Sequence, residues 1–172
     1  LTTHSHARDG DHPPRAPRWR GVDSLGSGDM PAVTSDALVL RAHKLGETSK
    51  IVVFLTRSHG KVRAVARGAR GRRSRFQPSL EPMSEVRIGL SGRQGADLQL
   101  LGQCDLVRSA FPHGARCLEN ALFLSYAAEL LDAFVAEGEP DERPFRLAQA
   151  VLKAAASGAG ERALARYLEA WL

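Results

Sequence analysis

The sequence is poor in cysteine and in aromatic residues, and it lacks a long apolar run. Only 2 of its 172 residues are cysteine, and 6% are aromatic. Cys104 and Cys117 make no metal-binding pattern by themselves; they could pair, but free thiols in a reducing cytosol fit better. The apolar runs are too short to cross a bilayer, and the N-terminus lacks the order of a secretion signal. These absences predict a soluble, cytoplasmic protein.

The sequence also lacks the common catalytic motifs. It has no phosphate-binding Gly-x-x-x-x-Gly-Lys-Ser/Thr loop, and the stretch from Gly68 to Gly71 resembles one only in glycine content. No cluster of His, Asp and Glu offers two-metal nuclease chemistry. We interpret Glu81 and Glu85 as surface or strand-end residues, and no spacing suggests a Ser-His-acid triad. We therefore expect no catalytic residue, no metal and no cofactor in this chain, and an enzyme is the weaker hypothesis.

The N-terminal segment differs from the rest of the chain. Residues 1–34 are rich in proline and glycine and have almost no periodic apolar residues, which predicts a disordered tail. Met30 is a plausible start of translation, in which case the preceding residues are read-through of upstream sequence. The remaining residues, at 43% hydrophobic and 25% charged for the whole chain, have ordinary globular composition.

Positive charge is concentrated in one window between Arg41 and Arg75. The window holds eleven Lys or Arg and one acid, Glu47, a net charge of +10, whereas the whole chain carries +5. Closely spaced cations repel each other, so such a cluster favours a polyanionic partner. The alternative is a solvated loop that only keeps the protein in solution. Gly68 and Gly71 leave the backbone free to follow a phosphate chain, and we favour nucleic-acid binding.

Five short strands are predicted before residue 110. Alternating or continuous apolar residues predict strands over residues 35–42, 50–57, 61–67, 80–90 and 97–107. Ser58-His59-Gly60 predicts a tight hairpin turn in which Gly60 supplies a positive φ, and His59 is interpreted as a turn residue. Consecutive short strands with hairpin-like connections favour a small closed or partly closed barrel, because an open sheet of this size would leave bare edges.

The hydrophobic period changes to that of helices after residue 114. Helices are predicted over residues 115–136, 144–156 and 160–172, the first from Leu118, Leu122 and Tyr126 at helical spacing. This half holds six basic and nine acidic residues, so the polyanion site belongs to the barrel. The third helix runs to Leu172 with no cap, which suggests a fragment of a longer protein. The expected organisation is α+β with segregated regions: a tail (1–34), a barrel domain (35–112) and a helical domain (113–172).

The motifs of the barrel resemble those of the DNA repair protein RecO family. The resemblance is carried by Gly46-Glu47-Thr48-Ser49, by His59-Gly60-Lys61, by Val65-Ala66-Arg67-Gly68-Ala69-Arg70 and by Leu80-Glu81-Pro82 after a basic loop. It covers residues 35–172, and the block between Gly46 and Pro82 is the specific part. The resemblance implies an N-terminal five-stranded OB-fold barrel followed by a helical domain.

The resemblance also implies a function. Members of the family bind single- and double-stranded DNA, anneal complementary strands, and work with RecR to load the RecA recombinase onto DNA coated by single-strand-binding protein. They recognise the acidic tail of that protein through the helical domain, and they act in the bacterial cytoplasm at the nucleoid. Members usually carry a four-cysteine zinc site in the later helical region. This sequence ends before that point, so zinc is not assigned to it.

The predicted nucleic-acid contacts are the cations of the third strand and the following loop, with one aromatic side chain. Phe76, after the arginines, is the candidate for stacking on a base, whereas Phe54 is expected in the core. The complete predicted set is Lys50, Lys61, Arg63, Arg67, Arg70, Arg72, Arg73, Arg75 and Phe76. With so few aromatic platforms, binding should be largely independent of sequence.

Three other functions remain open. The chain could be a protein-interaction adaptor whose acidic helical half docks other proteins, which predicts partner binding that is insensitive to salt. It could be an RNA-binding OB-fold module, which predicts a preference for RNA over DNA. A nuclease is the most distant of the three and predicts metal-dependent cleavage.

Overall fold

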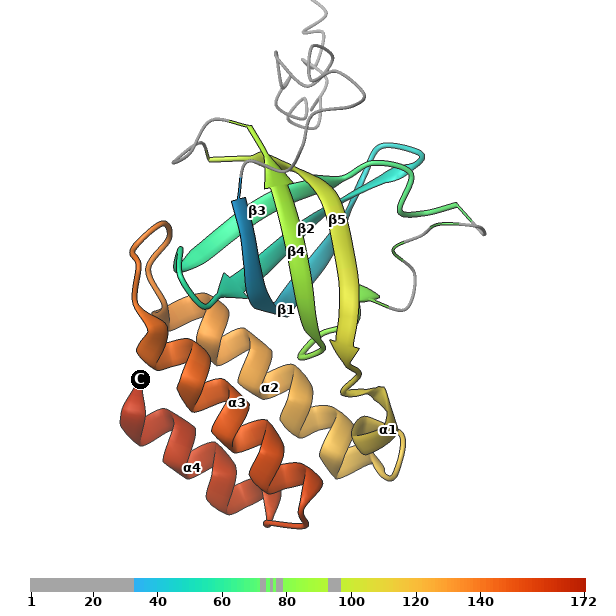
Figure 1. The fold of residues 1–172 in the computed structure, drawn as a ribbon. Coiled ribbons are helices and arrows are strands. Elements are labelled where there is room, and N and C mark those ends of the chain that lie inside the picture. Colours follow the sequence, from blue (N-terminus) through green and yellow to red (C-terminus); the bar gives the residue numbers. More distant parts are fainter. Residues whose placement is uncertain (1–32, 72–73, 75, 77–78, 93–96) are drawn as a thin grey trace, which may run out of the picture.

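The computed structural model describes residues 33–71, 74, 76, 79–92 and 97–172, which form a β-barrel followed by helices (Figure 1). The predicted tail lies outside the described residues, apart from its last two. The strands are β1 Val33–Leu45, β2 Ser49–Thr56, β3 Lys61–Ala66, β4 Glu85–Ser91 and β5 Gln99–Arg108. They form a closed barrel in the order β1-β2-β3-β5-β4. The predicted OB-fold barrel and helical region are confirmed.

Strand β1 closes the barrel because it is long enough to pair with two neighbours. It pairs antiparallel with β2 over most of its length and with β4 through its first residues. The only parallel contact among the named strands joins β3 and β5, with Ala64 opposite Gln99 and Val65 opposite Leu100. A register shift between Val39 and Arg41 bends β1 midway, as β-bulges do.

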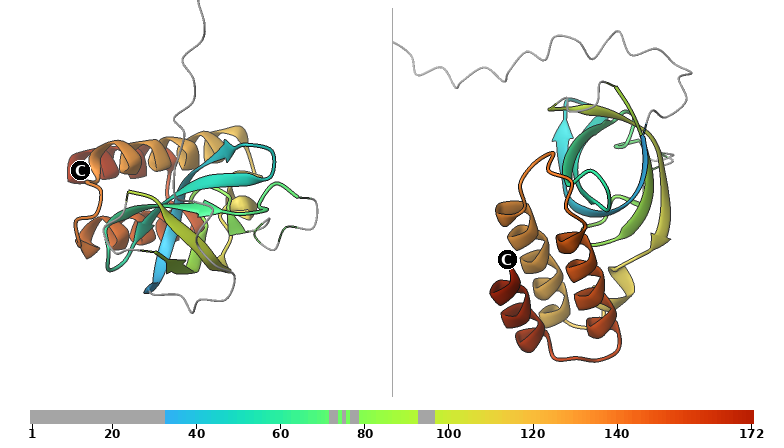
Figure 2. Two further views of the ribbon diagram at one scale, coloured as in Figure 1. Left: turned by 90° about the horizontal axis from the view of Figure 1, so that it is seen from above. Right: turned by 60° about the vertical axis from the view of Figure 1, so that its left-hand side comes forward.

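The alternation of side chains along β1 and β2 creates two cores. Ala37 and Val39 point into the barrel, while Leu38 and Leu40 pack against the helices. β2 repeats the pattern: its inward residues are Val52 and Phe54, and its helix-facing residues are Val53 and Leu55. Because neighbouring side chains on a strand point to opposite faces, a strand buried on both sides reads as a continuous apolar run. The right-hand view of Figure 2 shows the ring of strands beside the helices.

The helices are α1 Phe111–Gly114, α2 Leu118–Phe134, α3 Glu142–Ala156 and α4 Glu161–Trp171. The three long helices confirm the predicted ones, whereas α1 was not predicted. Helix α3 begins before Pro144 because the Asp141 side chain accepts a hydrogen bond from the backbone N–H of Arg143 at 2.9 Å and caps the helix. None of the described helices has the length and apolar character needed to cross a membrane.

Strand β4 begins at Glu85 rather than at residue 80. The preceding residues turn: Met83 has a φ of 62°, and its N–H donates to the carbonyl of Val39 at 2.7 Å. The N–H of Val39 in turn donates to the carbonyl of Ser84 at 3.1 Å. Pro82 has no N–H to give to a sheet, which explains why regular pairing starts only after this turn.

Candidate nucleic-acid interface

The basic window is divided between the two ends of the barrel. At the end near the helices, Asp132 of α2 contacts the Nζ of Lys61 through its main-chain carbonyl and through Oδ1 at 3.4 Å. The Oδ2 atom of Asp132 lies 3.3 Å from Nε of Arg41. Arg63 forms an ion pair with Glu137 in the connection between α2 and α3. Acids of the helical half therefore neutralise three cations of the window.

The surroundings of Lys61 argue against the prediction that it binds nucleic acid. Its side chain is only 8% exposed, and its charge is paired with that of Asp132 of α2. Arg63 is half-exposed and ion-paired, so a phosphate would have to compete with Glu137 for its guanidinium. The alternation along β3 places Lys61 and Arg63 on one face, but the helical half packs over the beginning of that face.

A close backbone contact fixes this end of the barrel to the helices. Gly60 follows β2 with a φ of 64°, which confirms the predicted positive value. A Cβ atom on Gly60 would lie 2.0 Å from the carbonyl oxygen of Glu139. The N–H of Gly138 donates to the carbonyl of Lys61 at 2.9 Å. Glycine is therefore required at position 60 both by its own backbone angle and by the neighbouring chain.

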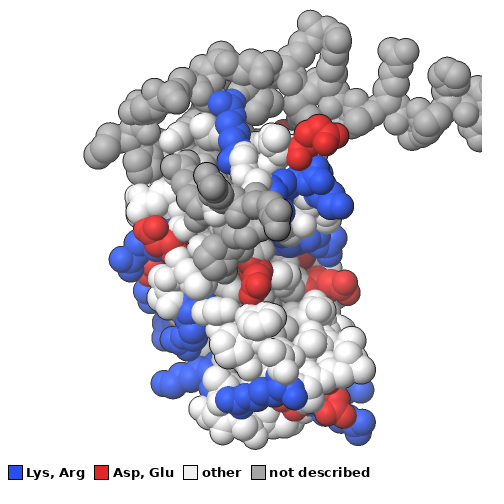
Figure 3. Space-filling view, turned by 90° about the vertical axis from the view of Figure 1, so that its right-hand side faces the viewer, with Lys and Arg blue, Asp and Glu red and all other residues white. Residues whose placement is uncertain are grey.

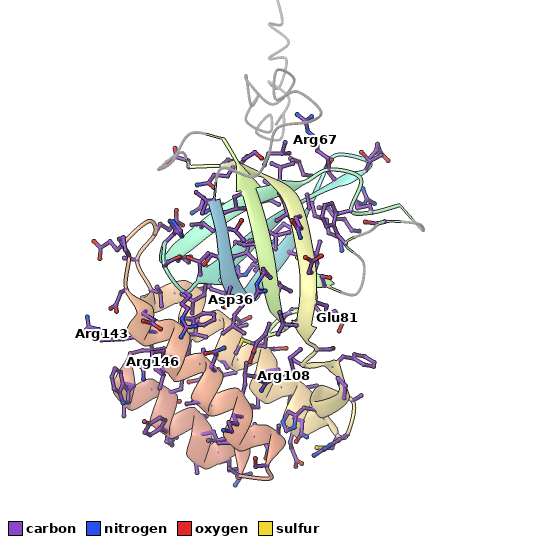
Figure 4. The ribbon with its side chains drawn as sticks, viewed as in Figure 1. Asp36, Arg67, Glu81, Arg108, Arg143 and Arg146 are labelled. Atoms are coloured by element: carbon purple, nitrogen blue, oxygen red, sulfur yellow. The ribbon has the colours of Figure 1, made fainter. Side chains whose placement is uncertain are left out.

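At the opposite end of the barrel lies a second group of cations, which we call the distal basic surface. Arg67 points away from the helices in Figure 4, and blue side chains lie on the upper part of the molecule in Figure 3. Lys44 and Lys50 are directly opposite each other across β1 and β2, and neither makes an ion pair with a described residue. Like charges in this position repel each other. The members of the surface are Lys44, Lys50, Arg67 and Arg70.

The loop after β3 is anchored to the β1–β2 turn, which brings the members of the distal basic surface together. The N–H of Arg70 donates to the carbonyl of Thr48 at 2.9 Å, and its Nη1 donates to the carbonyl of Gly46 at 2.6 Å. Lys44 is missing from the predicted set, because only the hairpin register places it opposite Lys50. Arg72, Arg73 and Arg75 lie outside the described residues and stay predictions.

Phe76 is buried in this structure, which argues against its predicted role as a stacking platform. Its side chain is only 2% exposed and belongs to the barrel core with Ala69 and Leu80. Phe54 is fully buried, as predicted. The exposed aromatic side chains of the described chain all follow β5, namely Phe111, Tyr126, Phe134, Tyr167 and Trp171. The described part of the distal basic surface therefore offers charge and hydrogen-bond donors rather than stacking.

The described residues contain no group of three or more His, Cys, Asp or Glu placed to hold a metal ion. Cys104 and Cys117 are both unpaired, as expected. Burial, together with the charge of Asp105, raises the pKa of the Cys104 thiol to about 12. This thiol is therefore protonated at neutral pH and is a poor nucleophile. The absence of an enzymatic activity stays a prediction.

Sequence comparison places the chain in a family. The family model for the N-terminal part of recombination protein O matches residues 30–110, and the model for its C-terminal part matches residues 116–172. The chain belongs to the RecO family. The first match includes all five strands of the RecO-type barrel, and the second includes α2, α3 and α4. The resemblance seen in the barrel motifs is thereby confirmed.

Curated RecO proteins are similar to the chain over most of its length. The DNA repair protein RecO of Pelotomaculum thermopropionicum is 39% identical over 140 residues, which cover 81% of this chain and 53% of that protein. The RecO protein of Koribacter versatilis is 35% identical over 139 residues, covering 80% and 56%. That of Bifidobacterium adolescentis is 39% identical over 138 residues, covering 77% and 53%. The chain thus spans about half the length of these relatives.

Proposed function

We propose that the chain binds DNA through the distal basic surface and acts in DNA repair. The observation that carries the proposal is the pair Lys44 and Lys50, two cations held opposite each other with no acid to neutralise them among the described residues. A phosphate backbone relieves that repulsion, and Arg70 lies beside the same turn. The relatives' printed name, DNA repair protein, agrees with this role.

The finer proposal is that the protein anneals complementary strands. A cationic surface screens two phosphate backbones and so lowers the repulsion between them. The distal basic surface has no exposed aromatic residue among its described members, so its contacts with DNA are mainly to phosphates. Phosphate contacts carry no sequence information, which suits a protein that must pair any two complementary strands.

The partners follow from the family resemblance alone. We propose that the chain binds single- and double-stranded DNA and the acidic tail of single-strand-binding protein. It would cooperate with RecR and so help load RecA, in the cytoplasm of a bacterium at its nucleoid. The proposed zinc site of the family belongs to a cysteine-rich region that this sequence does not contain.

Fluorescence anisotropy of a labelled single-stranded oligonucleotide across a salt series tests the DNA-binding role. About five phosphate contacts to a single strand predict a log–log slope of about −3.5 for affinity against salt. Adding the complementary strand then measures annealing, and gel analysis of the products shows whether cleavage occurs. We expect tight binding at low salt, a steep slope, faster annealing and intact oligonucleotides.

Charge reversal locates the site. The variant with Arg70→Glu, Arg72→Glu and Arg73→Glu should lose DNA binding while its circular dichroism spectrum is unchanged. A matched control reverses three cations of the helical half, Arg116, Arg162 and Arg166, of which only Arg166 is ion-paired among described residues. Equal loss of affinity in both variants would show that only net charge matters. Undiminished affinity in the first variant would refute the proposed site.

A protein-binding role for the helical half is a second candidate, favoured by its exposed apolar side chains. Along α2 these recur at helical spacing: Leu118 is 73% exposed, Leu122 58% and Phe134 65%. Clustered apolar exposure of this kind is typical of interaction surfaces. If this is the main role, partner binding is insensitive to salt and the oligonucleotide does not bind.

Repeating the titration with RNA of the same sequence tests the remaining alternative, an RNA-binding module, which predicts tighter binding to RNA than to DNA.

A further inference from the structure

A second basic surface lies between the barrel and α3, away from the distal basic surface. It is a groove of about 300 Å³ whose charged and polar lining consists of Arg57, Glu85, Arg108, Arg146, Gln149 and Lys153. Four cations face one carboxylate, a net charge of +3. Ala150 is the remaining lining residue, so no large apolar side chain lines the groove.

Three parts of the chain bring the cations together. Arg57 follows β2, Arg108 is the last residue of β5, and Arg146 and Lys153 belong to α3. Figure 4 labels Arg108 at the foot of β5 and Arg146 on α3, below the barrel. Figure 3 shows several Lys and Arg side chains along the left edge of the molecule at this height. The spacing of seven residues puts Arg146 and Lys153 on one face of α3, about 10 Å apart along its axis.

The cations of the groove are only partly neutralised. Arg57 pairs with Glu142 at 2.8 Å and lies 4.0 Å from Asp36. In contrast, Arg146 and Lys153 are exposed and make no ion pair with any described residue. A bound anion would therefore gain the most binding energy from these two side chains.

Glu85 forms an ion pair with Arg108 in the lining of the groove. Glu85 is 6% exposed, and its Oε1 has no hydrogen-bond partner but lies 3.7 Å from Nη1 of Arg108. Nε2 of Gln149 is 3.5 Å from Oε2 of the same carboxylate. The Arg108 side chain remains 58% exposed, so it is accessible to a ligand in the groove. An exposed guanidinium can bind phosphate oxygens with two N–H groups.

We propose that this groove is a second binding site for the phosphodiester backbone of a nucleic acid. The inference rests on the proposed DNA-binding function. A phosphate backbone matches a short row of exposed cations and needs no apolar pocket, whereas a peptide anchor usually requires one. Lys50 and Arg57 lie at opposite ends of β2, about 23 Å apart for seven residues of strand. The protein therefore holds two backbone segments apart, either two strands or two parts of one long strand.

The test compares three double variants of the full chain that change the net charge equally. The groove variant is Arg146→Glu with Lys153→Glu, the distal variant is Lys44→Glu with Lys50→Glu, and the control is Arg116→Glu with Arg162→Glu. The chain is bound to a biotinylated single-stranded oligonucleotide on beads, and a labelled, non-complementary oligonucleotide is added. Because these oligonucleotides cannot pair, retained label measures capture of a second strand by the protein.

We expect the groove variant to bind the first short oligonucleotide within about twofold of the control but to capture at least about tenfold less of the second. If the groove instead extends the site for one strand, the variant loses affinity for a long oligonucleotide and keeps it for a short one, which also supports the site. If the charge-reversed chain folds poorly, the neutral variant Arg146→Gln with Lys153→Gln takes its place. It should show the same pattern with smaller effects.

Two results overturn the proposal. One is a groove variant that matches the control for both second-strand capture and long oligonucleotides. The other is a labelled poly-glutamate peptide that binds the groove at a salt concentration at which DNA does not, because the groove then recognises an acidic protein. If the unmodified chain fails to bind even the first oligonucleotide at low salt, the proposed DNA-binding function fails, and this outcome is visible before any groove variant is compared.

Discussion

The two ends of the barrel carry the same kinds of side chain in different surroundings. Near the helices, Lys61 and Arg63 contact Asp132 and Glu137, acids that follow them by about seventy residues in the sequence. At the distal end, Lys44 and Lys50 face each other, and no described acid pairs with them. The first pair of cations attaches the barrel to the helical half, whereas the second is available to a polyanion.

The comparison shows that the number of cations in a window does not measure the size of a binding site. A cation becomes part of the tertiary structure when an acid reaches it and water is excluded, as for the 8% exposed Lys61. The same residue type remains a ligand site when it stays solvated.

Replacing Phe76 with Ala should lower the free energy of unfolding by about 3–5 kcal/mol, because it removes a buried aromatic ring from the barrel core. Chemical denaturation followed by circular dichroism measures the loss. Phe76→Leu is the sharper variant: it retains most of the volume, should cost under about 1.5 kcal/mol, and removes any ability to stack on a base. Unchanged DNA affinity in Phe76→Leu is expected, and a clear drop would restore Phe76 to the binding site.

Replacing Gly60 with Ala should destabilise the protein by about 3 kcal/mol or more, since the new Cβ collides with Glu139 and the backbone angle is unfavourable for other residues. Gly46→Ala at the distal end is a matched control. Gly46 has a φ of 57° but nothing within 4 Å of its added Cβ, so only the angular cost of about 1–2 kcal/mol applies. Equal losses in thermal or chemical unfolding would contradict the close contact between barrel and helices.

Replacing Lys61 with Met should lower the free energy of unfolding by about 2 kcal/mol, because Asp132 loses a partner at a largely buried position. Its DNA affinity and salt slope should match those of the unmodified protein, as measured by anisotropy. A stable variant that binds DNA less tightly would show that Lys61 contributes to DNA binding rather than to the attachment of the helices.

The elements of this fold could be predicted because they depend on local patterns. The continuous apolar run of β2 is explained by Val53 and Leu55 packing against the helices while Phe54 packs inside. The burial of Phe76 could not be predicted, since its neighbours in the sequence are arginines and polar residues. The chain returns to the barrel core there through Ala69 and Leu80, a tertiary contact that no local pattern encodes. The burial of Lys61 likewise depends on a tertiary contact, its ion pair with Asp132 of α2.

The smallest expected effect separates stability from binding most cleanly. Replacing Lys44 with Met removes one of two opposed cations, so the free energy of unfolding should rise by about 0.3 kcal/mol. The same change removes one phosphate contact and should reduce the magnitude of the salt slope by about 0.7 for a single strand. Arg162→Met, an exposed cation of α4, controls for net charge and should leave the slope unchanged. A Lys44 variant that is more stable but binds DNA less tightly is expected only if the two opposed cations form part of a ligand-binding site. A loss of stability with an unaltered slope would instead make Lys44 a structural residue like Lys61.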